Sequence, residues 1–124
     1  MHQNNRPKNL NLFTIRFPIP AIVSILHRLS GAVLFLLIPF VIWGLALSLT
    51  SDGFEMLVDW TSLFYIKFMI WLFFIPFCFH LVAGIRHLLM DIHIGSSLAM
   101  GRLFAKLTIL ISIFIIFLLG IWLW

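Results

Sequence analysis

The residues with the clearest capacity for chemistry lie between His80 and Asp91, after a long apolar and aromatic run. On a helix, His80, Gly84, His87 and Asp91 are spaced four, three and four residues apart and form one stripe. Ionisable residues within a membrane are costly and usually functional. Gly84 leaves a recess beside the imidazole that suits a porphyrin ring ligated by His80. His87 and Arg86 lie nearer the headgroups, where haem propionates would pair with arginine.

A second polar group precedes the first long apolar run. Ser24, His27, Arg28 and Gly31 share a helix face through spacings of three and four residues. A hydroxyl can donate a hydrogen bond to a carbonyl oxygen, and a guanidinium can stabilise negative charge that develops there. Ser24 and Arg28 therefore suit a lipid-soluble carbonyl compound such as a quinone.

Both groups also have plainer interpretations. An intramembrane histidine can hydrogen-bond a neighbouring helix, and Gly84 can be a packing contact between helices. Arg28 and its neighbours can anchor the chain through phospholipid headgroups. If haem binds, we expect a second chain to supply the other axial ligand. His80 has no partner at equal depth, because His27 lies at the surface end of its helix.

These side chains must be positioned by membrane-spanning helices. The chain has 124 residues, of which 63% are hydrophobic and 10% are charged, a composition suited to lipid. Uncharged stretches predict an all-α integral membrane fold with three transmembrane helices, at roughly 22–50, 62–90 and 105–124. The whole chain, 1–124, forms one transmembrane anchor domain, with a cytoplasmic arm at 1–18.

The distribution of charge predicts the orientation. Lysine and arginine are frequent in the N-terminal arm and around the second connection, where Arg86, Arg102 and Lys106 lie, and absent from the first connection. The positive-inside rule places the N-terminus in the cytoplasm and the C-terminus in the periplasm. We expect a multi-pass protein of the bacterial inner membrane, although a chain encoded in an organelle would look the same. No basic and aromatic pattern indicates nucleic-acid binding. The single cysteine, Cys78, has the position of a small buried hydrophobe.

Two separated motifs resemble signatures of one family. The first comprises residues 6–10, 15–18 and 24–31, and the second comprises residues 80–91. In this order they resemble the cytochrome b anchor subunit of succinate dehydrogenase, respiratory complex II, in its proteobacterial form. The resemblance extends over nearly the whole chain and includes its length and its three spans.

The resemblance implies a non-catalytic subunit of an oxidoreductase complex. A flavoprotein subunit oxidises succinate, and an iron–sulfur subunit relays electrons to the membrane. This chain and a second small anchor would share one haem b and help to form the ubiquinone site. By motif position, His80 would be the axial ligand of the haem iron. Ser24 and Arg28 would belong to the quinone site, with Arg28 and His27 on the propionate side of the haem.

Two other functions are consistent with the sequence. The anchor of a quinol:fumarate reductase would run the reaction in reverse. A membrane assembly subunit or small transporter would bind no cofactor. A transporter is expected to show paired intramembrane charges or internal repeats, and neither is visible here.

Overall fold

The computed structural model describes residues 17–124, which form four α-helices. They are α1 (Ile19–Ser48), α2 (Ser51–Ser62), α3 (Phe64–Asp91) and α4 (Leu98–Leu123). The predicted arm lies outside the described residues, except for its last two positions. The parts of the first signature at 6–10 and 15–16 also lie outside them.

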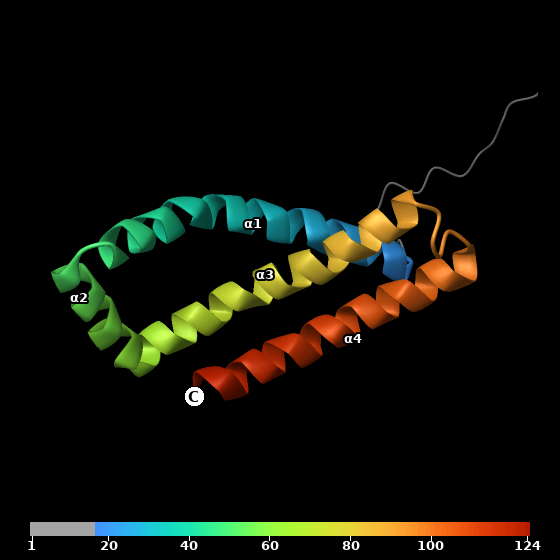
Figure 1. The fold of residues 1–124 in the computed structure, drawn as a ribbon. Coiled ribbons are helices and arrows are strands. Elements are labelled where there is room, and N and C mark those ends of the chain that lie inside the picture. Colours follow the sequence, from blue (N-terminus) through green and yellow to red (C-terminus); the bar gives the residue numbers. More distant parts are fainter. Residues whose placement is uncertain (1–16) are drawn as a thin grey trace, which may run out of the picture.

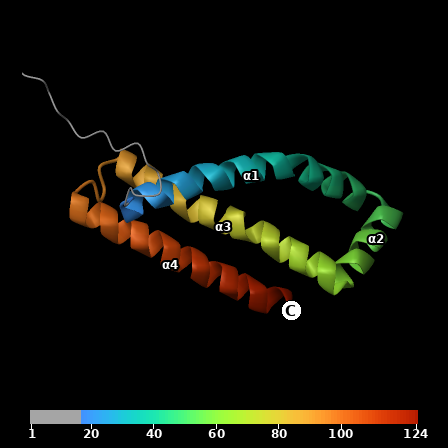
Figure 2. The same cartoon turned by 180° about the vertical axis from the view of Figure 1, so that it is seen from behind.

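The long helices α1, α3 and α4 run side by side along the bundle (Figures 1 and 2). Each is long and apolar enough to cross a membrane, so residues 17–124 contain three candidate transmembrane helices, the number predicted. Helix α2 connects α1 to α3 at one end, and the α3–α4 turn closes the other. Helices α1 and α3 lie close together near this turn and diverge toward α2 (Figure 1).

The helix ends follow from local sequence. Proline is tolerated in the first helical turn, where the missing N–H has no partner to lose, so Pro20 fits the start of α1. Helix α4 begins at Leu98, ahead of the predicted span, because the Ser97 side chain accepts a hydrogen bond from Met100 N at 3.3 Å. In the turn before it, Gly95 has a φ of 75°, in the left-handed region that favours glycine.

Helix α2 lies in the first connection, where the sequence analysis predicted no helix. The Thr50 side chain caps the helix by accepting a hydrogen bond from Gly53 N at 3.2 Å. Asp52, Glu55 and Asp59 follow at intervals of three and four residues and share one face. The helix is therefore amphipathic, as expected at a boundary between membrane and water.

The bundle packs through small side chains rather than a large apolar core. Val23, Ala83 and Ala105 are completely buried where α1, α3 and α4 meet, with Ile19, Phe79 and Ile109 around them. Cys78 is buried with 4% exposure, as predicted. Most larger apolar side chains point outward, which is the arrangement expected of helices solvated by lipid.

Candidate functional site

The site is built around the ring of His80, on the half of α3 that leads to the α3–α4 turn. Its Nδ1 lies 3.0 Å from the backbone oxygen of His27 and 3.1 Å from Oγ of Ser30. The Ser30 hydroxyl donates its own hydrogen to the His27 oxygen at 2.8 Å. Ser30 therefore acts as an acceptor toward His80, and both neighbours of Nδ1 are acceptors.

This hydrogen bonding assigns the tautomer of His80. A nitrogen facing two acceptors carries the proton, so Nδ1 is the N–H and Nε2 keeps its lone pair. Within residues 17–124, Nε2 forms no hydrogen bond. A histidine that donates one ring N–H to a backbone carbonyl and presents the other nitrogen has the usual arrangement of a metal ligand.

Three imidazoles gather at this point. The ring of His27 stacks on that of His80, with centroids 4.2 Å apart and planes 15° apart. The ring of His87 approaches His27 from the next turns of α3, at 5.0 Å and 39°. The prediction that His27 lies at a different depth from His80 is therefore wrong. Stacked parallel rings nevertheless cannot approach one metal ion from opposite sides.

Two glycines make room for these rings. A Cβ on Gly31 would lie 2.9 Å from Cε1 of His80, closer than side-chain atoms normally approach. A Cβ on Gly84 would lie 3.4 Å from Nε2 of His27. Gly84 thus faces His27, whereas the sequence analysis expected it to open a recess beside His80. Gly31 is the glycine that lets His80 approach α1.

The other predicted residues are distributed over different faces. Ser24 is half-buried and Arg28 is exposed, one turn apart on α1. The His27 ring, by contrast, lies against His80 and His87 of α3. Arg86 does not accompany His87, because its side chain is buried beside α4. The sequence analysis placed Arg86 with the propionates, but helix geometry puts consecutive residues about 100° apart.

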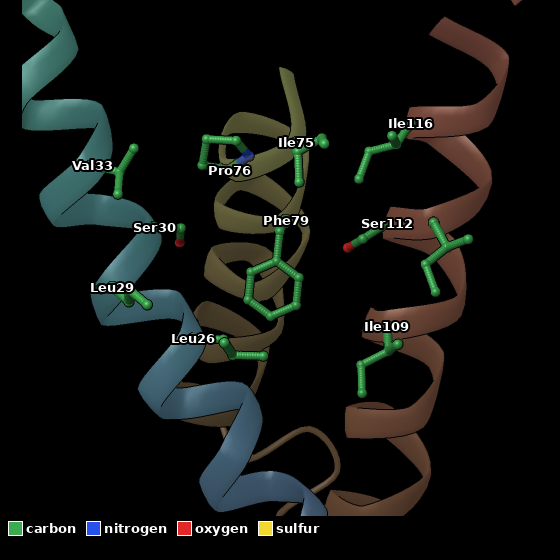
Figure 3. A pocket seen from close by; sticks show the side chains of 11 residues that line it. Leu26, Leu29, Ser30, Val33, Ile75, Pro76, Phe79, Ile109, Ser112 and Ile116 are labelled. Carbon is green, nitrogen blue, oxygen red and sulfur yellow. The ribbon is translucent and has the colours of Figure 1, made fainter. Parts of the chain in front are cut away.

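Ser30 is a contact of His80 that the sequence analysis missed. It was seen only as part of the motif, although it lies three residues after His27, the spacing for a bond from its hydroxyl back to the His27 oxygen. Ser30 also lines a cavity of about 440 Å³ between α1, α3 and α4 (Figure 3). Figure 3 shows Phe79 and Pro76 on the α3 side and Ser112 on the α4 side. The rest of the lining is aliphatic, so the cavity suits hydrocarbon.

Together, these features define a helical membrane protein with a polar histidine cluster at one end of its bundle. Residues 2–119 match the family described as succinate dehydrogenase/fumarate reductase transmembrane subunit. The chain therefore belongs to this family of membrane anchors of respiratory complex II. It is a multi-pass protein of the bacterial inner membrane, as the sequence analysis predicted.

Relatives cover most of the chain. It is similar to the succinate dehydrogenase cytochrome b556 subunit of Coxiella burnetii, with 39% identity over 123 residues, covering 96% of this chain and 97% of the relative. The subunit of the same name in Rickettsia prowazekii is 32% identical over 118 residues, covering 95% and 93%. That of Paracoccus denitrificans is 33% identical over 100 residues, covering 77% and 74%.

Proposed function

We propose that this chain anchors succinate dehydrogenase in the membrane, binds haem b through His80 jointly with a second anchor, and contributes Ser24 and Arg28 to ubiquinone reduction. The observation that carries this proposal is the pair of acceptors around Nδ1 of His80, which leaves Nε2 available. The name cytochrome b556, which the relatives carry, supports haem b.

The residues around His80 fit a haem in their chemistry. His80 Nε2 would hold the iron, and the hydrogen bond from Nδ1 to a backbone carbonyl would fix the ring and raise the basicity of Nε2. Arg28 and His27 would interact with the propionates, for which a guanidinium is well suited. When bound, haem b supplies a one-electron redox centre. The second axial ligand would come from the other anchor, since His27 stacks on His80 instead of opposing it.

Ser24 and Arg28 are one turn apart on α1 and are accessible from outside the chain. Ser24 would donate a hydrogen bond to a quinone carbonyl oxygen, and Arg28 would stabilise the negative charge that this oxygen gains on reduction. Residues of the other subunits would complete the site. In this arrangement the iron–sulfur and flavoprotein subunits bind on the cytoplasmic side, with the N-terminus of this chain, and the C-terminus faces the periplasm.

The test is a reduced-minus-oxidised optical spectrum of the complex purified through this chain. We expect a low-spin b-type spectrum in the wild type, and loss of haem or a changed spectrum in His80→Asn. His93→Asn is the matched control, because His93 is exposed in the α3–α4 turn and its φ of 65° is one that asparagine tolerates. Unchanged haem content and spectrum in His80→Asn would reject the ligand role. A wild-type complex that contains no haem would reject the cytochrome role and favour the alternative of a cofactor-free anchor.

A further inference from the structure

Arg86 is a buried cation in the last turns of α3. Its side chain is 5% exposed, and within residues 17–124 its Nε has no hydrogen-bond partner. It lies five residues before the end of α3, roughly 8 Å from the helix terminus. An unpaired charge at such a position is costly, so an anion is expected beside it.

The chain itself has no suitable anion to offer. It contains four acidic residues, and three of them, Asp52, Glu55 and Asp59, lie on α2 at the opposite end of the bundle. The fourth, Asp91, is exposed and lies five residues from Arg86 on α3, about 140° around the helix. Residues 1–16 include no aspartate or glutamate. The anion must therefore come from another molecule.

The surroundings of Arg86 indicate which molecule. Arg86 lines a groove of about 210 Å³ between α3 and α4, which lie side by side in Figure 1. Its other lining residues are apolar except for Thr108: Val82, Ile85, Leu89, Phe104, Leu107 and Ile111. Ile85, Leu107 and Ile111 are exposed, so the groove opens toward the lipid.

The groove has one cation near the end of the bundle, with apolar Leu89 beyond it, and a longer apolar floor deeper in the span. Arg86 lies toward the end of the bundle where α3 leads into α4, whereas Val82 and Ile111 lie further into the span. Basic pockets of this kind between transmembrane helices bind anionic headgroups. We infer that the α3–α4 groove binds an anionic phospholipid, with its phosphate on Arg86 and an acyl chain along the apolar floor.

This site is separate from the histidine cluster. Arg86 is six residues from His80, which places it about a third of a turn around α3. His80 and His87 point toward α1, and Arg86 points toward α4. The inference therefore stands without the proposed haem or quinone roles.

The experiment uses the complex purified through this chain and placed in nanodiscs that contain a photoactivatable phosphatidylglycerol. Cross-links to residues 82–111 are quantified by mass spectrometry. We expect saturable labelling that unlabelled phosphatidylglycerol displaces and phosphatidylcholine does not. Arg86→Gln should lower labelling about fivefold, the effect of one cationic side chain near anionic lipid. Arg102→Gln, the same change at an exposed site on α4, should leave it unchanged.

A second pair of variants leaves Arg86 intact. Leu107→Trp should fill the groove and lower labelling, whereas Leu110→Trp, at an exposed site outside the groove, should not. If Arg86→Gln prevents assembly of the complex, this pair of variants still tests whether the groove binds the lipid. Wild-type labelling in both Arg86→Gln and Leu107→Trp would overturn the inference. Absence of saturable labelling in the wild type would overturn it as well and would point to an anionic group of another subunit.

Discussion

Replacing Gly31 by alanine is the most direct test of how α1 positions His80. The added Cβ would lie 2.9 Å from Cε1 and 3.4 Å from Nδ1 of that ring. Non-bonded carbon atoms are most stable at about 3.5–4.0 Å, so the ring must move by roughly half an ångström or more. Such a movement pulls Nδ1 away from the His27 oxygen and from Ser30, which now lie at 3.0 and 3.1 Å.

The size of the effect follows from the bonds at risk. Each neutral hydrogen bond contributes about 1 kcal/mol, and disturbing the groups that orient a metal ligand typically costs about 10–100-fold in metal affinity. We therefore expect Gly31→Ala to retain haem at least about tenfold more weakly than the wild type. Haem per complex during a detergent-dilution series, together with the reduced-minus-oxidised spectrum, measures this difference.

Gly44→Ala is the matched control on the same helix. A Cβ there would meet no atom within 4 Å, so this variant has the same change in helix propensity without the contact. The difference between the two variants isolates the contact with His80. If Gly31→Ala and Gly44→Ala retain haem equally well, the reasoning from this contact is refuted.

Two further predictions concern α1. Ser30→Ala removes one of the two acceptors near Nδ1 of His80, and since one hydrogen bond contributes about 1 kcal/mol, it should weaken haem retention about fivefold. Ser48→Ala loses a similar bond to a backbone oxygen three residues earlier and should leave haem retention unchanged. Equal haem retention in the two variants would contradict the prediction. Arg28→Gln should slow ubiquinone reduction about 10–100-fold, the value of a charge-assisted hydrogen bond, and spare succinate oxidation by an artificial dye. Arg102→Gln should spare both activities, and equal loss of both in Arg28→Gln would indicate failed assembly instead of a quinone role.

The spans could be predicted from the sequence because their signal is length and apolarity, which tertiary packing does not alter. Helix α2 was missed because residues 50–53 carry turn-forming side chains. The same Thr50 and Gly53 that suggest a turn form a helix cap in the structure. A short amphipathic helix at the membrane surface has no long uncharged run to reveal it.

The relative depth of His27 and His80 could not be obtained from sequence. His27 lies eight residues inside α1, about 12 Å from its start, and His80 lies eleven residues from the end of α3, about 17 Å. Taken along each helix alone, these values differ by almost one turn. The two helices lie close together at this end of the bundle, and Gly31 and Gly84 admit the rings, so the imidazoles stack. The sequence contained both glycines but not the pairing between them and the two rings.

The ring and the backbone oxygen of His27 make different contacts. Its ring packs between His80 and His87 over Gly84, whereas its backbone oxygen accepts the hydrogen bonds that orient His80. A side-chain substitution at His27 leaves that oxygen in place, because it belongs to the continuous backbone of α1. The residues that can be changed to disturb the orientation of His80 are therefore the small ones that follow, Ser30 and Gly31. The alignment of His80 is thus a property of the backbone of α1 and of small side chains, while the exposed Arg28 of the same motif remains available to groups supplied from outside the chain.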